Sequence, residues 1–544
     1  MARNRDHPDG GWDMVNGGVA VVAGLAVGAA LINDAASTVL QAGPAPALGL
    51  LAAGGAGLAL AGGKLAGGIG GIRWPGAAPK PLGGEVRWAS AWELLRSGWA
   101  SGDGWPLGVA SACGGLLPLT IRMPDRAQRR NTLVLAPNGS GKSTGIMVPA
   151  LRSEATVRDA ARRHSLIVGD ASGEVQEMAG DVLATSHRQL TINTDQLAAS
   201  NVGFDALSWI PDYRDPRFRA EAYRAAKVFL AATEADESED ARAHARDPYW
   251  PQQVSGALLA ILLYLKARNP GTTLVDVCDY LIDVDPENIV RQLVGHPLTA
   301  AAALGGSAMQ ELIINDKARS AVFSDLKHRL ALLTDPRVRA LFGGGALPPF
   351  DLGRFLDEPS VLYLQVGSPG DPTSPVISIV MATIQMQLIR RAARTRRLPR
   401  DVRFLIDEVG SIGRIYGLDA GVATLRKYGV GFMLICQTLD QLRTNYGEKR
   451  ASTIVQNMVH RLALGGVADQ DAAWVCQNLG HRNNYRAVPG ESGDTASTHY
   501  TREDWPLLRP DQLRRHTYKV VLDSALLPPV LLRLRSYAPK GARP

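Results

Sequence analysis

The segment Ala136-Pro-Asn-Gly-Ser-Gly-Lys-Ser143 has the residue types and spacing of a phosphate-binding loop. Glycine suits such a loop because the backbone must wrap closely around phosphates, and a Cβ would obstruct it. The backbone N–H groups then point inward at a helix N-terminus, where they attract anions. Lys142 can reach the β- and γ-phosphates, and the Ser143 hydroxyl can bind Mg²⁺. The predicted nucleotide contacts are Ala136, Pro137, Asn138, Gly139, Ser140, Gly141, Lys142, Ser143 and Thr144.

The residues on either side of the loop agree with this interpretation. Asn131 to Leu135 is a short apolar run typical of a buried strand. Thr144 to Leu151 can begin a helix, although Pro149 would kink an early turn. The alternative is an ordinary Gly/Ser loop, which the combination of strand, loop and Lys-Ser pair disfavours.

A second acidic element follows at Val402-Arg-Phe-Leu-Ile-Asp-Glu408. The run is typical of a parallel strand that is buried on both faces, and ligands bind at the carboxyl ends of such strands. Asp407 is predicted to hold Mg²⁺ through water, and Glu408 to polarise the attacking water. Alone, the pattern is more often a strand that meets a polar turn. Together with residues 136–143 it indicates a nucleotide-hydrolysing site.

A third apolar run, Gly431 to Cys436, ends at Gln437. A polar amide at a strand end can contact the γ-phosphate or the attacking water. It can equally be a glutamine that begins a loop, and the sequence leaves both readings open.

The 544 residues are too many for one hydrophobic core, so two or more domains are expected. The net charge of +7 permits nucleic acid or anionic lipid as a partner without requiring either. The cysteines lack C-x-x-C spacing and indicate neither a disulfide framework nor a zinc site. They are Cys113, Cys278, Cys436 and Cys476.

Two uncharged stretches near the N-terminus, Gly17 to Ile32 and Ala47 to Gly63, predict a membrane hairpin of two transmembrane helices. The connecting loop has no Lys or Arg, whereas basic residues flank the pair, so both ends are expected in the cytoplasm. A cleaved signal peptide would have a single apolar region. A flexible Gly/Ala linker is the remaining alternative.

From about residue 87 the sequence predicts an α/β fold with a mostly parallel sheet and helices on both faces. The strand-like runs are 132–135, 166–168, 361–366, 404–406, 432–435, 461–464 and 520–522. Residues 205–345 break this rhythm and predict an inserted all-α domain. Its expected helices cover 217–232, 252–267, 274–281, 286–293 and 307–332.

A basic cluster precedes the Asp407 strand and could follow a phosphate backbone. Its members are Arg390, Arg391, Arg394, Arg396, Arg397 and Arg400. No aromatic residues interleave for base stacking, so a helix C-terminus followed by an exposed loop is the favoured interpretation.

These elements, in this order, resemble the type IV secretion system coupling proteins, the conjugative DNA-transfer ATPases of bacteria. The resemblance covers nearly the whole chain, including the two apolar stretches and the phosphate-binding loop. Further matching segments are Gly84 to Leu95, Asp247-Pro-Tyr-Trp250, Ile406-Asp-Glu-Val-Gly-Ser-Ile-Gly-Arg414, Leu425-Arg-Lys-Tyr-Gly-Val430, Cys436-Gln-Thr-Leu-Asp-Gln-Leu-Arg443, Tyr446-Gly447 and Asn457.

The resemblance implies a RecA-like P-loop ATPase domain that assembles as a ring, as a homo-hexamer, with ATP and Mg²⁺ between subunits. Arg426 lies where the family has a candidate arginine that completes the neighbour's site, and Arg443 is the second choice. A role as an ordinary surface charge is as well supported for Arg426. One departure is Asp170-Ala-Ser-Gly-Glu174, where family members often have lysine in place of Ser172.

The implied domains are a membrane hairpin at 1–72, a nucleotide-binding domain in two parts at 73–204 and 346–544, and the all-α domain at 205–345. The implied function is an inner-membrane, multi-pass ATPase with a cytoplasmic motor. It would recruit a relaxase–single-stranded DNA substrate and translocate it into a secretion channel. The alternatives are a receptor ATPase for protein effectors only, and a duplex DNA translocase.

Overall fold

The computed structural model describes residues 86–100, 103–112, 117–233, 249–296, 311–365, 371–410, 412–490, 497–515, 519–535 and 537. Both stretches predicted to cross a membrane lie outside these residues. Within the described ranges, one helix, α17 (Pro375–Thr395), is long and apolar enough to span a membrane. In its apolar window 67% of the residues are buried inside the protein, so packing in the core explains its composition.

An eleven-stranded sheet organises the α/β part, with the order β2-β1-β13-β12-β9-β3-β8-β7-β4-β6-β5. Its strands are β1 (Trp105–Ala112), β2 (Leu117–Met123), β3 (Thr132–Leu135), β4 (Ser165–Asp170), β5 (Arg188–Asn193), β6 (Ser360–Gln365), β7 (Val402–Asp407), β8 (Val430–Cys436), β9 (His460–Leu464), β12 (Lys519–Ser524) and β13 (Leu527–Arg533).

The strands from β9 to β5 are all parallel, and β12, β13, β1 and β2 extend the sheet with antiparallel pairs. Each of the seven predicted strand runs overlaps one of these strands, so the prediction of a mostly parallel sheet is confirmed. Four strands of this sheet were not predicted from the sequence: β1, β2, β5 and β13. Three of these belong to the antiparallel extension, and β5 is an edge strand.

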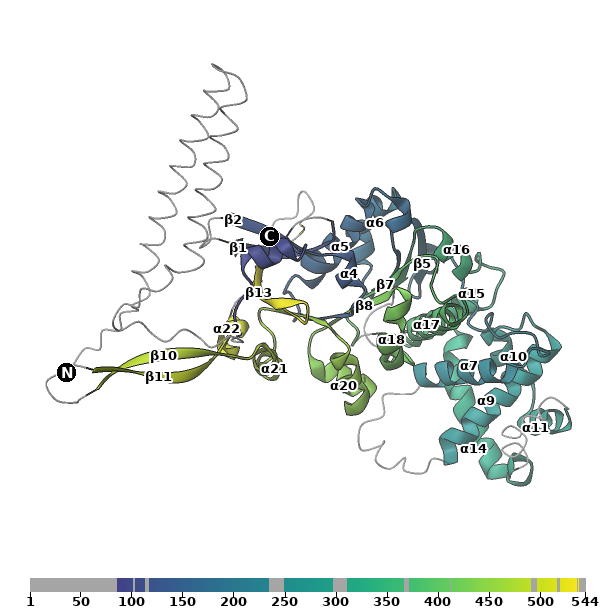
Figure 1. Ribbon diagram of the computed structural model, residues 1–544. Coiled ribbons are helices and arrows are strands. Elements are labelled where there is room, and N and C mark those ends of the chain that lie inside the picture. The colour runs from purple at the N-terminus through teal and green to yellow at the C-terminus, as the bar shows by residue number, and fades with distance from the viewer. Residues whose placement is uncertain are drawn as a thin grey trace, which may run out of the picture. The chain divides into compact units, whose positions relative to one another are not determined.

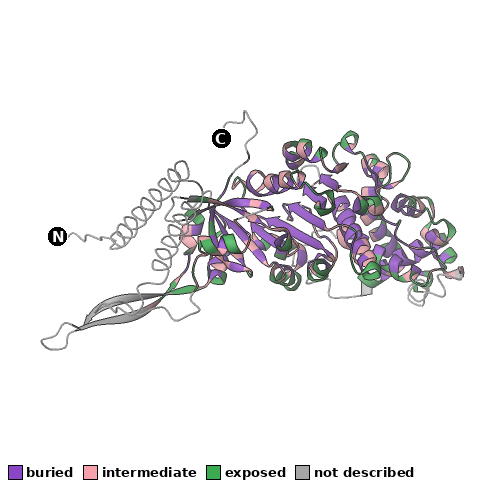
Figure 2. Cartoon of the chain, turned by 45° about the horizontal axis from the view of Figure 1, so that its top comes forward, coloured by how far each residue is buried: buried purple, intermediate pink, exposed green. Residues whose placement is uncertain are grey.

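Alternating residues of the central strands enter two separate cores, one on each face of the sheet. On β3, Leu133 and Leu135 face one core and Val134 faces the other. The register of β4 against β7 places Asp170 beside Asp407 at the carboxyl ends of their strands. Figure 2 shows the buried strands between layers of helices whose outer residues are exposed.

The helices are α3 (Ala91–Arg96), α4 (Asp125–Gln128), α5 (Val148–Ala155), α6 (Glu174–Ala184), α7 (Phe218–Ala232), α9 (Tyr249–Arg268), α10 (Leu274–Asp283), α11 (Pro286–Gly295), α14 (Asp316–Leu330), α15 (Pro336–Phe342), α16 (Leu352–Asp357), α17, α18 (Leu418–Thr424), α19 (Leu439–Tyr446), α20 (Glu448–Gln456), α21 (Asp469–Leu479) and α22 (Pro510–Arg515). Short turns of helix are η2 (Ser143–Met147), η3 (Ala160–Arg162), η4 (Leu197–Ala199), η5 (Ala331–Thr334) and η6 (Leu425–Tyr428).

Every regular element in the described part of 205–345 is helical, and of these helices α7 lies beside α17 (Figure 1). The core on the α17 face of the sheet continues into α7, α9, α10 and α14 without a break. The single helix predicted over 307–332 is wrong, because the helix that precedes Asn315 ends there and α14 begins at Asp316. The Asn315 side chain accepts a hydrogen bond from the Ala318 N–H and caps α14. The domain limits at 205 and 345 stay a prediction.

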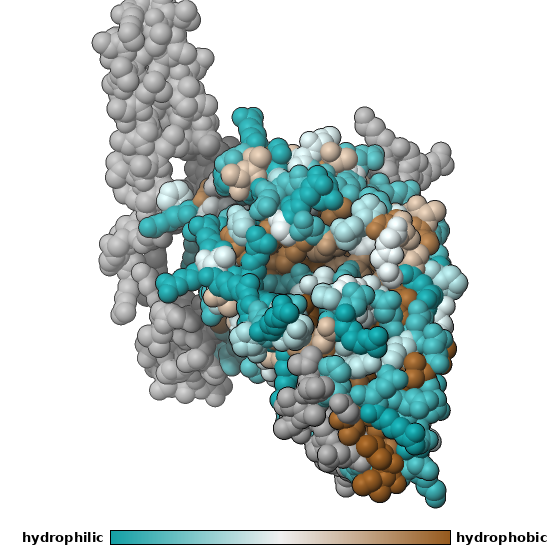
Figure 3. Space-filling view, turned by 90° about the vertical axis from the view of Figure 1, so that its right-hand side faces the viewer, coloured by the Kyte–Doolittle hydropathy of each residue, from teal (hydrophilic) through white to brown (hydrophobic). Residues whose placement is uncertain are grey.

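The surface of this helical region is mostly hydrophilic, with apolar residues gathered at one end (Figure 3). Separately from the large sheet, β10 (His481–Gly490) pairs with β11 (Ser497–Pro506) in a two-stranded sheet. Most of this hairpin, residues 485–503, belongs to a second compact unit.

A buried polar cluster holds the amino end of β7. The Arg403 side chain is fully buried, and its guanidinium donates to the Gly429 carbonyl at 2.7 Å and to Asp125 Oδ1 at 3.2 Å. Asp401 Oδ2 lies 3.3 Å from the same guanidinium, and His164 Nε2 lies at 3.1 Å. A buried charge is tolerated only when it is paired and hydrogen-bonded, so this cluster fixes where β7 begins.

Candidate nucleotide site

The predicted phosphate-binding loop joins the carboxyl end of β3 to the turn η2. The Ala136 N–H donates to the Cys436 carbonyl at 2.9 Å, and the Ser140 N–H donates to the Pro137 carbonyl at 3.2 Å. Gly139 and Gly141 have φ values of +72° and +82°, which residues with a Cβ rarely adopt. Pro149 lies directly after η2, a turn of π-helix that runs without interruption into α5, so the helix is locally widened just before the proline.

Lys142 and the second acidic element meet directly. Lys142 Nζ lies 2.5 Å from Glu408 Oε2 and 4.0 Å from Asp407 Oδ1. The Lys142 side chain is 18% exposed and the Glu408 side chain 9%. Because β3 is separated from β7 only by β8, the parallel register brings their carboxyl ends to one edge of the sheet. The sequence prediction that these two elements share a site agrees with this geometry.

Ser143 and Asp407 form the second contact between the same elements. Ser143 Oγ donates to Asp407 Oδ2 at 2.7 Å. Burial raises the pKa of Asp407, and the hydrogen bond from Ser143 and the charge of Lys142 oppose that shift. The other oxygen of each carboxylate, Asp407 Oδ1 and Glu408 Oε1, is buried and accepts no hydrogen bond from the described part of the chain.

The two carboxylate oxygens that accept no hydrogen bond from the residues that the structure describes, Asp407 Oδ1 and Glu408 Oε1, indicate where a metal ion could bind. A buried polar atom without a partner is costly, and a cation or water would satisfy it. Mg²⁺ prefers oxygen ligands, usually one or two carboxylates with waters and phosphates. Ser143 Oγ and Asp407 therefore fit the predicted metal position.

Glu408 has a φ of +76°, one of two positive values at non-glycine residues in the described chain. A bulky residue in the left-handed region is strained by about 1–3 kcal/mol and persists only where its surroundings hold it. Two side chains hold Glu408 in this conformation. Lys142 Nζ lies 2.5 Å from Glu408 Oε2, and Gln437 Nε2 donates a hydrogen bond to the same oxygen at 2.8 Å. The strain aims the carboxylate at the loop rather than along the strand.

Gln437 is held in turn by a residue that the sequence analysis did not select. Gln441 Oε1 accepts a hydrogen bond from the Gln437 N–H at 2.9 Å, and Gln441 also completes a capping box with Thr438 at the start of α19. The Thr-x-x-Gln spacing is a readable helix-start signal and could have identified it. Of the two readings left open for Gln437, contact with the site agrees with the geometry.

The segment Asp170 to Glu174, where Ser172 stands in place of the lysine that family members often have, leads into helix α6. Asp170 accepts hydrogen bonds from the N–H groups of Val175 and Gln176 at 3.2 and 2.8 Å, and so caps α6. Burial and the nearby Asp407 charge raise the pKa of Asp170 to about 6. Glu174 and Ser172 are exposed. Asp170 therefore contributes a carboxylate beside Asp407 that is easily protonated.

The two candidate arginines lie in different places. Arg426 is exposed on η6, directly before the amino end of β8, so it lies at the sheet edge opposite the loop of its own subunit. Arg443 is on α19, which follows the carboxyl end of β8. It contacts Asp440 at 2.6 Å and Glu448 at 3.3 Å. The structure brings neither arginine to the Lys142–Glu408 pair.

The C-terminal segment contacts the loop, which the sequence analysis did not anticipate. The Tyr537 N–H donates to the Thr144 carbonyl at 2.8 Å, and a Cβ built on Gly145 would lie 2.5 Å from the Leu534 side chain. The Arg152 guanidinium lies 4.4 Å from the centre of the Tyr537 ring. Apolar contact of this kind shields one side of η2 from water.

Comparison with known proteins identifies a family that matches this chain. The model of the family described as type IV secretory system conjugative DNA transfer matches residues 110–529. The conjugal transfer protein TraG of Escherichia coli is 25% identical over 346 residues, which is 59% of this chain and 51% of TraG. The VirD4 protein of Rhizobium rhizogenes is 24% identical over 221 residues, 39% of this chain and 32% of VirD4. The chain thus spans about half or less of these relatives.

Solved structures of the bacterial conjugative coupling protein TrwB have the same fold. The unbound form gives a TM-score of 0.61 at 17% identity, covering 85% of this chain and 95% of that one. A TrwB structure in complex with ADP and Mg²⁺ gives 0.59 at 17% identity, covering 85% of this chain and 96% of that one. At this identity the likeness concerns the fold alone.

We predict that Asp170→Asn changes how stability depends on pH. A carboxyl whose folded pKa of about 6 exceeds its unfolded value of 3.8 lowers stability as pH rises through that window. From pH 4 to 7 the variant should therefore gain up to about 3 kcal/mol relative to the natural protein. Thermal unfolding of the full chain across this range measures the difference. Asp181→Asn, at an exposed site on α6, is the matched control, and parallel curves for Asp170→Asn would contradict the prediction.

Proposed function

The chain belongs to the type IV secretory system conjugative DNA transfer family, and from that premise we propose that it is the ATPase that couples a DNA substrate to a secretion channel. The observation that carries the proposal is the meeting of Lys142 and Ser143 with Glu408 and Asp407 at one sheet edge. A cation, a hydroxyl and two carboxylates in this arrangement suit a nucleoside triphosphate and a divalent metal.

The proposed mechanism begins with an exchange of partners. Lys142 pairs with Glu408 at 2.5 Å, and nucleotide phosphates in the loop would attract Lys142 away from that carboxylate. Glu408 would then keep only the Gln437 amide and become free to polarise a water. In this proposal Glu408 becomes available as a base only after nucleotide phosphates have attracted Lys142 away from it.

Mg²⁺ would be held by Ser143 and by Asp407, the latter through water, and would neutralise charge on the phosphates. Asp407 has one oxygen on Ser143 and one without a hydrogen-bond partner in the described chain, so it can accept from metal-bound water. Asp170 lies beside Asp407, and because its pKa is raised to about 6, its own carboxyl group could exchange a proton there.

The finer parts of the proposal concern the assembly. We place residues 1–72 in the bacterial inner membrane as two helices and the remaining domains in the cytoplasm. A homo-hexameric ring would place ATP between subunits, with Arg426 of one subunit completing the site of the next. Relaxase-bound single-stranded DNA would be the substrate and the secretion channel the destination. The printed names, conjugal transfer protein for TraG and conjugative coupling protein for TrwB, support the DNA-transfer part of this proposal.

ATP hydrolysis by the full chain in nanodiscs, with and without single-stranded DNA, tests the function. We expect DNA to stimulate hydrolysis and Lys142→Ala to abolish it. Glu408→Gln should keep nucleotide affinity but lower kcat by roughly 10²–10⁴-fold, because only the base is lost. Lys449→Ala, at an exposed site on α20, controls for loss of a lysine. Hydrolysis indifferent to DNA would favour a receptor for proteins, and turnover by Lys142→Ala would contradict the site assignment.

Arg426→Ala tests the contribution from a neighbouring subunit. An arginine that stabilises transition-state charge in trans is worth about 10³–10⁵ in kcat, so homogeneous variant rings should be nearly inactive. Mixing with Lys142→Ala subunits should restore part of the activity, because some interfaces then combine an intact loop with an intact arginine. Lys427→Ala, the exposed neighbour on η6, should remain active. Absence of rescue in mixed rings would remove the role in trans.

A further inference from the structure

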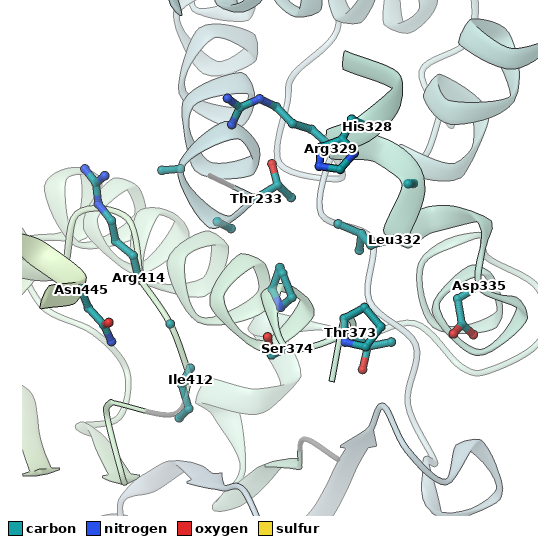
Figure 4. Close-up of a pocket in the computed structure, with 16 residues that line it drawn as sticks. Thr233, His328, Arg329, Leu332, Asp335, Thr373, Ser374, Ile412, Arg414 and Asn445 are labelled. Carbon is teal, nitrogen blue, oxygen red and sulfur yellow. The ribbon is translucent and has the colours of Figure 1, made fainter. Parts of the chain in front are cut away.

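A groove separates the helices of 205–345 from the loops at the carboxyl ends of β6 and β7. It consists of two adjoining cavities of about 550 and 460 Å³, which share Ala231, Arg329 and Arg414 in their walls. The first cavity, seen in Figure 4, is lined by the ends of α7 and α14 on one side and by Ser374, Ile412 and Arg414 on the other. Its size is that of ordinary ligand pockets.

Nearly all the charged side chains that line the groove are basic. They are Lys227, Arg329, Arg414 and Arg450, against the single carboxylate of Asp335, and the His328 side chain lines the same wall. Asp335 already pairs with Arg337 at 2.7 Å. Asp325 holds Arg329 at 2.9 Å, and this fixes the Arg329 side chain in the wall. A concave surface of one charge sign concentrates ligands of the opposite sign.

Uncharged groups in the groove also suit an anionic chain. Thr233, Thr373, Ser374 and Asn445 offer hydroxyl and amide groups along the first cavity. The amino end of α17 opens there, since Ser374 is its N-cap. The second cavity adds Tyr416, a half-buried aromatic ring on which a base can stack. This combination of cations, hydroxyls and an aromatic ring is typical of single-strand binding sites.

The groove is connected to the nucleotide site by a short segment. Glu408 contacts Lys142 and Arg414 lines the groove, so only five residues of the chain, 409–413, separate the two sites. Helix α19 holds this segment at two points, because Asn445 Nδ2 donates to the Gly410 carbonyl at 3.2 Å and the Ile415 N–H donates to the Tyr446 hydroxyl at 3.1 Å. The same helix begins next to Gln437.

We propose that this basic groove binds the backbone of single-stranded DNA, with Arg414 and Arg450 contacting phosphates and Tyr416 stacking on a base. The inference rests on the proposed function, because it takes its ligand from the DNA-transfer assignment. It differs from the interpretation of the arginine cluster at 390–400 as a DNA-binding surface. A strand in the groove would touch the segment that carries Glu408, which gives a direct route from DNA binding to hydrolysis.

Binding of fluorescein-labelled oligothymidylate by the full chain in nanodiscs, over a series of salt concentrations, tests the groove. Arg414→Gln with Arg450→Gln removes two charges from it, and Arg450 is exposed on α20, so its loss alone should leave the fold intact. The matched control, Arg158→Gln with Arg515→Gln, removes two exposed charges that lie outside both the groove and the arginine cluster at 390–400. The slope of log affinity against log salt should fall by about 1.4 in the groove variant, at about 0.7 per phosphate contact.

The outcomes are distinguishable. Weaker binding and a smaller slope in the groove variant alone, with unchanged affinity for a fluorescent ADP analogue, would support the proposal. Equal loss in both double variants would overturn it, because bulk charge would then explain binding. If the natural protein binds no oligothymidylate at any salt concentration, the proposed DNA-transfer function fails, and the proposal that the groove binds DNA fails as a consequence. Selective loss of binding to relaxase peptides, with DNA binding intact, would assign the groove to a protein partner and overturn the proposal.

Discussion

Two carboxylates at the end of β7 are buried beside each other and must be paired, and the nucleotide site is organised around that requirement. Asp407 and Glu408 take a hydroxyl and an ammonium group from the loop between β3 and η2, at 2.7 and 2.5 Å. Removing one partner of a buried charge pair leaves an uncompensated charge, which is strongly unfavourable. The loop can therefore release Lys142 only when another anion attracts it. Phosphate is the anion that the loop's inward N–H groups favour.

The position of these carboxylates depends on the strand that carries them. At its amino end β7 is fixed by the buried Arg403 guanidinium, and at its carboxyl end by the contacts of Asp407 and Glu408. The chain then turns through the positive φ of Glu408 toward Arg414 and the basic groove. Helix α19 contacts both Gln437 and this segment, so we expect a movement at the nucleotide site to displace the wall of the groove. Under the proposed function, one short stretch of chain would therefore link hydrolysis to DNA binding in the groove.

Local patterns were sufficient to predict the loop at 136–143 and the strand that ends at Asp407, since both depend on apolar runs that are buried on both faces. The parallel order then brings them together. For Gln437 the sequence left two readings open. The antiparallel strands β1, β2 and β13 were not predictable in the same way, because their pairing depends on distant partners. The contact of Tyr537 with Thr144 belongs to the same class. Gln441 and the capping role of Asp170 involve neighbours in the sequence, and the Thr-x-x-Gln spacing is a signal by which Gln441 could have been found. The basic groove could not be read from the sequence, because its cations come from α7, α14, α20 and the loop after β7.

The most direct test of this account is the affinity of the full chain for ADP with and without Mg²⁺, measured by titration calorimetry. The account predicts that Mg²⁺ tightens binding in the natural protein and that Ser143→Ala or Asp407→Asn removes the effect while ADP still binds. Lys142 and the loop N–H groups would explain that remaining affinity. Binding that is equally tight in EDTA, or that keeps its Mg²⁺ dependence without Ser143 and Asp407, would contradict the assignment of this site.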